Sequence, residues 1–445
     1  MRLKMIGKVF LLPLLFLSAV AAFAQESKLD DFAAQAAQVT EFEVNGLKVI
    51  VKKRALSPTV AGGLFIRGGA RNINEKNAGI ESLMLSTAMD AGKTLPRQTV
   101  RRELASMGSA FGASVTNDFS VVSFGSTRQN FDRAWEIYSE VLLNPAFAEE
   151  DIKRNRELIL TGLREAGTVP EGALETLQER VIYADHPYAN DVNGTIATIG
   201  SLTANDLRAY HKNLMETSRL LLVFVGDLDA EQLKTKIAAT FGKLPRGTYK
   251  ETQYPALDFS KGTLDTAQRA LPTNYVKGVF AAPAPGSPDY NAMRVAMSIL
   301  QTLVYQEVRG RLQLSYAPDA DMNNFSANTA NISVSTNDPN RAIAAMKQQI
   351  KLLQDRTLNE DVIDEIAAFF LTRHYLGQET SGAQVGELAR YELVGGGWRN
   401  SFEFLKGVRA VTARDVQNVA NKYMKNLRFF YIGNTTDVNR AVYIP

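Results

Sequence analysis

Apolar and polar positions alternate with a period of two near the start of the chain and change to helical spacing further on. An extended stretch with period two predicts a strand that buries one face, and apolar positions three or four residues apart predict an amphipathic helix. The dipeptide Asn45-Gly46 in the first alternating stretch is typical of a tight hairpin turn. The pattern predicts strands over 42–53, 59–67 and 119–125, and helices over 79–91 and 131–142, the last ended by Pro145.

Two segments far apart in the chain carry the same pattern. Residues 201–229 and 410–434 each carry Thr-Ala-x-Asp near their start, continue as an amphipathic helix, and then form an apolar strand that runs into a glycine. Thr203 and Thr412 stand 209 residues apart, and threonine followed three residues later by aspartate is a helix-start signal. A second pair, around residues 59–65 and 275–280, has a similar offset. We therefore expect an internal duplication.

Strands interleaved with long helices predict an α+β fold, in which helices cover a mostly antiparallel sheet. The duplication divides the chain into two homologous domains, which we place at residues 25–243 and 263–445. Residues 244–262 have little periodicity and contain Pro245, Gly247 and Pro255, so we interpret them as the linker.

The first 24 residues have the character of an export signal. A basic start is followed by the apolar stretch Val9–Val20, which is too short to span a bilayer comfortably. Ala22-Phe23-Ala24 provides the small-x-small cleavage pattern, so we expect cleavage after Ala24 and export to a bacterial periplasm. After cleavage the sequence predicts no membrane span.

Composition removes several classes of chemistry. The chain has 445 residues with no Cys, which excludes disulfides, thiolate metal sites and a cysteine nucleophile. The 50 basic and 47 acidic residues give no sign of a nucleic-acid surface. The three histidines, His186, His211 and His374, show no ligand spacing, and we do not expect any of them to bind a metal.

The order of landmarks along the chain resembles the pitrilysin/insulinase family of inverted-zincin metallopeptidases, especially its short, processing-peptidase-like members. The resemblance rests on a series of motifs spread over about 400 residues. They are Gly68-Gly69-Ala70-Arg71, Asn77-Ala78-Gly79-Ile80, Leu104-x-x-x-Gly108, Val141-Leu142-Leu143-Asn144-Pro145, His186-Pro187-Tyr188, the Leu-Thr-Ala-x-Asp helix, and Arg309 to Tyr316.

The resemblance implies an H-x-x-E-H zinc motif on the helix after Gly79-Ile80, with a further Glu nearly eighty residues on. Here Ser82 and Ser86 occupy the histidine positions, Leu85 that of the general base, and Gly162 that of the third ligand. Serine hydroxyls are poor zinc ligands and leucine cannot accept a proton. We therefore expect no catalytic residue, no metal and no cofactor in this chain.

Three carboxylates, Glu81, Glu157 and Glu165, lie near the lost ligands in the sequence. They could be proposed to hold a hard cation. Scattered carboxylates rarely form a metal site alone, so we interpret them as solvated helix residues.

The second half keeps a different element of the family pattern. Arg309 and Tyr316, seven residues apart after a helix over 293–307, match the positions that the resemblance assigns to substrate binding. A guanidinium and a phenol can hydrogen-bond a scissile carbonyl and stabilise its oxyanion. Arg311 is the less favoured alternative to Arg309.

The resemblance also implies that the strand over 109–116 binds peptide by strand addition. The contact positions would be Ser109, Gly112, Ala113 and Thr116, with Gly112 where the family usually has Asn.

A chain that keeps the substrate-binding pair and lacks the metal is consistent with one subunit of a heterodimer. We expect a non-catalytic subunit of a zinc peptidase, in which an H-x-x-E-H partner holds the zinc and cleaves the peptide. The alternative is a peptide-binding or scaffold protein that has no catalytic partner.

Overall fold

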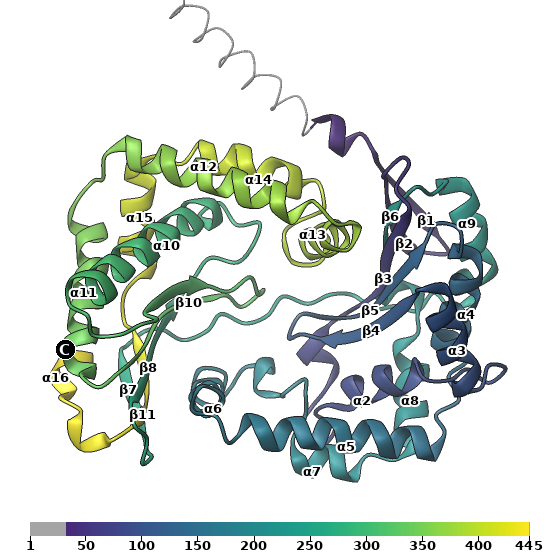
Figure 1. Cartoon of the computed structure of the whole chain (residues 1–445), viewed down its shortest axis with the longest axis horizontal. Helices are drawn as coiled ribbons and strands as arrows, with labels where there is room; N and C mark the ends of the chain where they lie inside the picture. The colour runs from purple at the N-terminus through teal and green to yellow at the C-terminus, as the bar shows by residue number, and fades with distance from the viewer. Residues whose placement is uncertain (1–32, 445) are drawn as a thin grey trace, which may run out of the picture.

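The computed structural model describes residues 33–444, which form two layered halves of similar design (Figure 1). The proposed export signal lies outside these residues. The first half is built on a six-stranded sheet in the order β1-β2-β6-β3-β5-β4, antiparallel except for the parallel pair β2 and β6. Its strands are β1 Val39–Val44, β2 Leu47–Lys53, β3 Thr59–Arg67, β4 Ala110–Val115, β5 Phe119–Thr127 and β6 Leu220–Gly226.

The second half repeats this plan with five strands in the order β7-β11-β8-β10-β9. Only β7 and β11 run parallel. The strands are β7 Thr263–Gln268, β8 Asn274–Ala281, β9 Asp319–Met322, β10 Thr329–Thr336 and β11 Arg428–Gly433. The expected α+β fold with two mostly antiparallel sheets is confirmed.

Helices pack one apolar face onto each sheet. In the first half an aromatic cluster of Phe124, Phe224, Trp135 and Tyr138 joins the sheet to its helices, with rings meeting mostly edge to face. The first-half helices are α2 Ile80–Ala88, α3 Arg97–Met107, α4 Phe131–Leu143, α5 Glu149–Ala166, α6 Pro170–Ile182, α7 Ile196–Ser201, α8 Ala204–Leu214 and α9 Ala230–Ala239. The second-half helices are α10 Tyr290–Val304, α11 Pro339–Asp355, α12 Glu360–Gly377, α13 Ser381–Val394, α14 Asn400–Arg409, α15 Ala413–Tyr423 and α16 Arg440–Tyr443.

Local signals in the sequence are reproduced in the structure. Asn45 and Gly46 form the two-residue turn between β1 and β2, both with positive φ. The helix starts at Thr203 and Thr412 are complete capping boxes, in which the threonine and an aspartate three residues later bond each other's backbone N–H. The helix expected over 79–91 is shorter, because α2 ends at Ala88.

The opposite face of each sheet is covered by a helix from the other half. Helix α6 places Leu174 and Leu177 in one apolar cluster with Val279, Phe430 and Ile432 of the second sheet. Helix α13 of the second half lies along β3 and β6 of the first sheet (Figure 1). Its apolar residues Val385, Leu388 and Ala389 cluster there with Ile50, Phe65, Leu221, Val223 and Val225. Each half therefore contributes one helix to the layer that covers the other half's sheet, an arrangement that we call the helix exchange.

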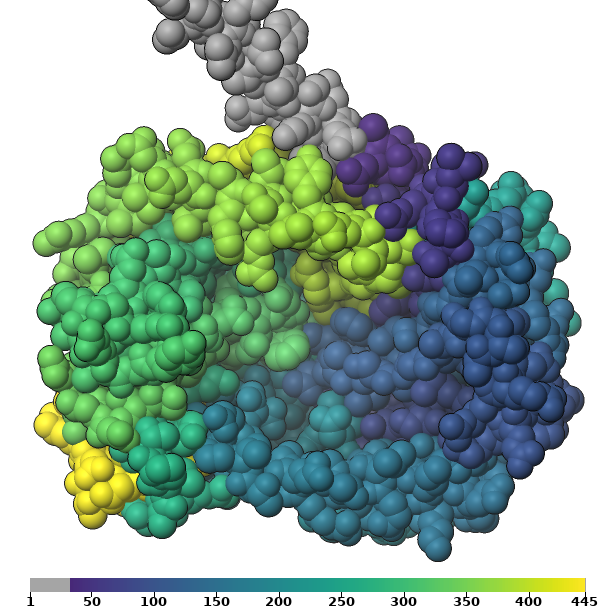
Figure 2. All heavy atoms as spheres, in the orientation of Figure 1, coloured from purple at the N-terminus to yellow at the C-terminus, as the bar shows by residue number. Residues whose placement is uncertain are grey.

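Between the halves, one face of the molecule is hollowed at its centre, where second-half atoms in green meet first-half atoms in blue (Figure 2). The segment 244–262 contains neither helix nor strand and carries the chain from the first half to the second. Within residues 33–444, no helix combines the length and apolar character needed to cross a bilayer.

Because α13 covers the first sheet, shortening one of its buried side chains should destabilise the fold strongly. Leu388 is 2% exposed and packs against the first sheet. The substitution Leu388→Ala should lower the free energy of unfolding by about 2–5 kcal/mol, because removing a large buried side chain leaves a cavity. The matched control is Leu376→Ala on α12, where Leu376 is 60% exposed, and it should cost less than about 1 kcal/mol. Urea unfolding of the two variants measures both values. Equal costs would show that α13 does not hold the halves together.

Candidate functional site

Helix α2, which would carry a zinc motif in the resembling family, begins at a glycine that cannot be replaced cheaply. Gly79 has a φ of 81°, and a Cβ there would lie 2.6 Å from Ile199 Cδ1 and 2.7 Å from the Cα of Gly194. This close approach fixes the start of α2 against α7, while the helix itself packs on α5 and β4. The scaffold around the metal position is therefore retained.

The side chains at the metal positions cannot hold zinc. Ser82 and Ser86 are half-buried on α2, and Leu85 is 2% exposed within the apolar core of the first half. Gly162 on α5 is exposed and a Cβ there would meet nothing within 4 Å. Two hydroxyls, an alkyl group and a glycine offer neither the imidazoles nor the carboxylate that the zinc set requires.

The nearby carboxylates do not replace the lost ligands. Glu157 and Glu165 are exposed on α5, as expected. Glu81, in contrast, is 4% exposed, so its interpretation as a solvated helix residue is wrong. Among residues 33–444, no three His, Cys, Asp or Glu side chains come together in a group that could hold a metal ion.

Glu81 lies in a buried polar network. Tyr210 Oη donates to Glu81 Oε2 at 2.6 Å, and Asn72 Nδ2 approaches the same oxygen at 3.4 Å. Arg219 Nη1 donates to Asn72 Oδ1 at 2.6 Å and its guanidinium stacks on Tyr249 at 4.0 Å from the ring centroid. Burial raises the pKa of Glu81, while these hydrogen bonds and the charge of Arg219 act in the opposite direction. The network ties α2 to the start of β6 and to α8.

The histidines lie in three separate places. His186 Nδ1 accepts from the backbone N–H of Tyr188 at 3.1 Å, and His211 Nε2 lies 2.8 Å from the carbonyl of Leu142. His374 on α12 lies 3.8 Å from Glu387. Each has a local structural partner, and no two of them pair as ligands.

In the second half, Arg309 and Tyr316 lie against each other. The Arg309 guanidinium stacks on the Tyr316 ring at 4.0 Å, and its Nη1 donates to the Tyr316 carbonyl at 3.0 Å. Tyr305 approaches the same guanidinium at 5.0 Å from its ring centroid. Tyr316 is 79% exposed, so the ring and its hydroxyl face solvent. We call these three residues the Arg–Tyr cluster.

Helix geometry explains how the cluster forms. The helix after which Arg309 was expected is α10, and it continues without a break into a π-helical turn, Tyr305–Arg311. π-Helical turns are rare and occur frequently at functional sites. The sequence spacing identified Arg309 and Tyr316 but gave no signal for Tyr305.

Arg311, the alternative to Arg309, is already engaged. Its Nε donates to Glu307 Oε2 at 2.7 Å, one helical turn away, and this bond lowers the pKa of Glu307. No carboxylate of the described residues lies within ion-pair distance of Arg309. Arg309 is therefore the guanidinium that retains donors for a ligand.

The strand expected over 109–116 is β4, Ala110–Val115, at the edge of the first sheet. Ser109 and Thr116 flank it, and both hydroxyls bond within the chain, to Ser126 Oγ at 2.9 Å and to the Phe119 carbonyl at 2.7 Å. A Cβ at Gly112 would lie 3.1 Å from Ser123 Oγ. Gly112 and Ala113 thus lie on a strand with one unpaired edge.

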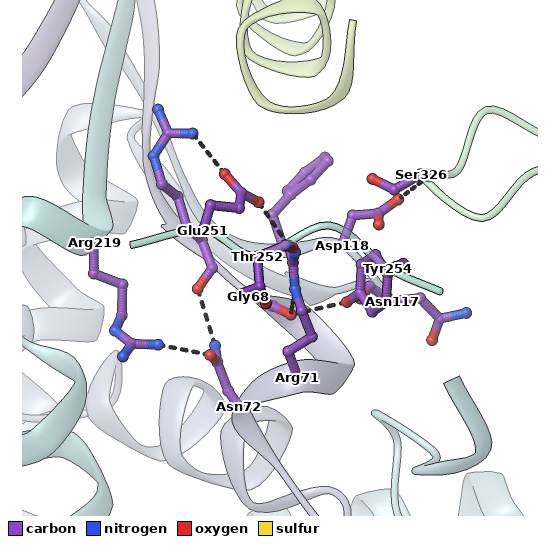
Figure 3. Close-up of polar contacts among 12 residues, drawn as sticks. Gly68, Arg71, Asn72, Asn117, Asp118, Arg219, Glu251, Thr252, Tyr254 and Ser326 are labelled. Atoms are coloured by element: carbon purple, nitrogen blue, oxygen red, sulfur yellow. Dashed lines mark hydrogen bonds and ion pairs between the residues drawn. The ribbon is translucent and has the colours of Figure 1, made fainter. Parts of the chain in front are cut away.

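A set of polar contacts that the sequence did not indicate holds the linker to the first half (Figure 3). Glu251 pairs with Arg71 at 2.6 Å and with Arg67 at 3.2 Å, and Arg71 also donates to the Thr252 carbonyl and stacks on Tyr254. Only Arg71, in the Gly68-Gly69-Ala70-Arg71 landmark, was singled out by sequence.

Asp118 joins the halves directly. Its Oδ2 accepts from the backbone N–H of Ser326 at 3.0 Å (Figure 3). Its Oδ1 accepts from Tyr188 Oη at 2.6 Å. Asp118 is 3% exposed and burial raises its pKa against these bonds. The loop before β10 is thereby fixed against the first sheet.

Comparisons with known proteins match this architecture. A family model described as Insulinase (Peptidase family M16) matches residues 48–196, and one described as Peptidase M16 inactive domain matches residues 201–369. Subunit beta of the yeast mitochondrial-processing peptidase is 21% identical over 424 residues, which cover 90% of this chain and 92% of the relative.

A second relative is matched only in part. Bovine cytochrome b-c1 complex subunit 1 is 26% identical over 266 residues, 59% of this chain and 55% of the relative, so the chain spans about half its length. A solved structure from Pseudomonas fluorescens, described as a peptidase M16 inactive domain, superposes with a TM-score of 0.77 at 18% identity, over 89% of this chain and 98% of that one. This likeness shows the fold.

The fold and the altered α2 together define a peptidase-like scaffold with no zinc-binding set among its described residues. The chain belongs to the insulinase family, peptidase family M16.

The raised pKa of Glu81 predicts a pH-dependent effect of Glu81→Gln. A carboxyl group whose pKa is higher in the folded state stabilises the fold below its unfolded pKa of about 4.3, and this contribution is lost as the pH rises through the folded-state value. Relative to Glu81→Gln, the wild type should therefore lose unfolding free energy as the pH rises from about 4 towards neutrality.

Urea unfolding of both proteins at several pH values measures this difference. The control is Glu157→Gln on the exposed face of α5, which should stay within about 0.5 kcal/mol of the wild type throughout. A difference between wild type and Glu81→Gln that does not change with pH would contradict the assignment.

Proposed function

We propose that this chain is the zinc-free subunit of a periplasmic, heterodimeric zinc peptidase. It binds the peptide substrate and completes the active site of an H-x-x-E-H partner of the same family, which holds the zinc. Residues 25–243 and 263–445 act as two peptidase-like domains joined by the linker 244–262. One contrast carries the proposal: the Arg–Tyr cluster is assembled, while Ser82, Leu85, Ser86 and Gly162 provide no ligand.

The arrangement of Arg309 supports a role in binding a carbonyl oxygen. No carboxylate within residues 33–444 neutralises its charge, and two aromatic rings restrict its orientation. A preorganised, unpaired guanidinium beside an exposed phenol can stabilise the negative charge that develops on a peptide carbonyl when the partner's nucleophile attacks.

The surroundings of the cluster support peptide binding. Ala317, directly after Tyr316, lines a cavity of about 410 Å³ together with Glu171 and Glu175 of α6 and Lys277 of β8. Both halves therefore contribute to the space beside the cluster. The unpaired edge of β4 offers backbone groups to an extended peptide in the first half.

Relatives support the subunit role, since those named above are each described as a subunit of a larger assembly. Export rests on the leader-like sequence of residues 1–24, which lie outside the described part of the chain. The second candidate is a peptide-binding or scaffold protein without a catalytic partner. The same edge strand favours it, and the experiment below distinguishes it from a peptidase subunit.

The proposal predicts that peptide cleavage requires both chains. The purified chain should contain no stoichiometric zinc and should not cleave unstructured peptides, because its α2 positions hold no ligand. Mixing it with an H-x-x-E-H chain encoded beside it should produce peptidase activity and one equivalent of zinc per heterodimer, measured by fluorogenic peptide turnover and metal analysis. Stoichiometric zinc and full activity in the isolated chain would refute the proposal. Peptide binding without any co-purifying zinc peptidase would instead support the scaffold alternative.

The Arg–Tyr cluster predicts the effect of two substitutions on that complex. Arg309→Ala should lower kcat by about 10²–10³-fold, as does the loss of an oxyanion donor in other hydrolases, and Tyr316→Phe should lower it by at least about tenfold. Arg311→Ala is the matched control, since Arg311 is paired with Glu307, and it should retain near wild-type turnover. Wild-type kcat in both Arg309→Ala and Tyr316→Phe would remove the cluster from the mechanism.

A further inference from the structure

A large groove of the second half runs along the outer edge of β9. It has a volume of about 780 Å³ and is walled by α10 and α12. Along α12 the residues Glu365, Phe369 and Arg373, spaced four apart, face the groove, and Arg294 and Gln301 face it from α10. Its size is that of a ligand site rather than a packing defect.

Side chains of α10 occupy the edge of β9. Gln301 Oε1 accepts from the backbone N–H of Ala320 at 2.6 Å, and Arg294 Nη1 approaches the carbonyl of Met322 at 3.4 Å. An added peptide strand would have to displace both of these contacts. The groove therefore offers its side chains, more than its backbone, to a ligand.

At one end the groove continues into a smaller cavity of about 180 Å³, which we call the arginine cavity. Arg294, Arg373 and Arg390 all line it. Asp319 and Asp321 line the groove but not this cavity, so positive charge gathers at this end. An anionic group would be attracted there.

The guanidiniums of the arginine cavity have aromatic neighbours but no ion-pair partner among the described residues. Arg294 lies 5.8 Å from the ring of Phe370, Arg373 lies 5.6 Å from Phe369, and Arg390 stacks on Tyr391 at 4.5 Å. Arg390 Nη1 is shielded from solvent and has no hydrogen-bond acceptor in the described part of the chain. A buried, charged donor without an acceptor costs free energy that an anionic ligand would recover.

The carboxylate that faces the arginine cavity is committed elsewhere. Glu387 of α13 accepts a hydrogen bond from the side chain of Gln378 and lies 3.8 Å from His374. Burial raises the pKa of Glu387, while the charges of Arg390 and Lys52 and the hydrogen bond from Gln378 act in the opposite direction. This single carboxylate cannot neutralise three guanidiniums. The arginines thus lack a full internal neutralising partner.

The duplication places this groove where the first half has its altered metal position. Helices α5 and α12 have equal length, and Gly162 and Arg373 each stand thirteen residues after the helix start. Arg294 and Ser298 on α10 are one turn apart and face the groove, as Ser82 and Ser86 are one turn apart on α2. One copy of the scaffold carries small residues there and the other carries arginines.

We propose that the arginine cavity binds a carboxylate of a peptide, either an acidic side chain or the C-terminal carboxylate, while the adjoining residues lie in the groove along β9. It rests on the proposed function only in that the ligand is a peptide. Guanidiniums recognise carboxylates through charge-assisted, bidentate hydrogen bonds. The site would thus select among peptides held by this chain independently of cleavage by a partner.

Direct binding to the isolated full chain tests the proposal. The probe is a short fluorescein-labelled peptide in four versions, with Glu or Gln at one internal position and with a free or amidated C-terminus, followed by fluorescence anisotropy. At least one carboxylate-bearing version should bind about tenfold or more tightly than the version with neither carboxylate. Comparison of the Glu and free C-terminus versions shows whether the side-chain or the C-terminal carboxylate is bound. Four equal affinities would overturn the proposal.

Substitutions of the arginines test whether the arginine cavity causes the preference for a carboxylate-bearing peptide. Arg294→Gln and Arg390→Gln should each abolish it, and Arg373→Gln, at an exposed position, should weaken it without affecting folding. The control Arg341→Gln, on an exposed position of α11 outside the groove, should retain it. A preference that persists in Arg294→Gln and Arg373→Gln would overturn the assignment. Displacement of the peptide by equimolar inorganic phosphate would show a free-anion site and would also overturn it. Because partner and zinc are absent, the result is independent of the cleavage assay.

Discussion

Each sheet of this chain needs an apolar layer on both faces, and in each half the second layer is a helix from the other half. Leu174 and Leu177 of α6 are buried against the second sheet, and Leu388 of α13 is buried against the first. Separating the halves would expose both sheets at once, which opposes a hinge between them. The ion pairs of Arg71 with Glu251 and the bonds of Asp118 add orientation to this apolar contact. The hollow between the halves is therefore a fixed feature.

This constraint explains how the metal site can be lost while the fold remains. The position of α2 depends on the close approach at Gly79 and on the burial of Leu83, Met84 and Leu85, and none of these contacts involves a metal. Glu81 adds a buried network with Tyr210 and Asn72. In small domains that are held together by a structural zinc ion, metal binding supplies folding free energy directly, and loss of the ion unfolds the domain. Here the helix packs through its apolar side, and substitution of the ligand positions leaves that packing intact.

The sequence predicted those features whose cause is local. The Asn45-Gly46 hairpin, the capping boxes at Thr203 and Thr412 and the two similar halves follow from turn chemistry, capping and period. The helix exchange could not be predicted, because the apolar face of α6 or α13 shows that a helix is buried but not against which sheet. Glu81 was misjudged for the same reason: its burial depends on Tyr210, far away in sequence.

Sequence spacing could not show which arginines are free to bind a ligand. The side chains that surround each guanidinium in the structure decide this. Arg311 and Arg71 are neutralised by glutamates, so their charge stabilises the chain itself. Arg309 and Arg294 are bordered by aromatic rings, which orient a guanidinium without satisfying its hydrogen-bond donors. A protein retains such a partly desolvated, unneutralised charge at a cost, and a ligand that supplies the missing acceptors repays it. Arg294 lies on α10 and Arg309 directly after it, whereas the equivalent helix of the first half, α2, carries serines and a leucine at the metal positions. If both proposals hold, ligand binding falls to the second copy of the scaffold, while the first copy supplies the fold without a zinc-binding set among its described residues.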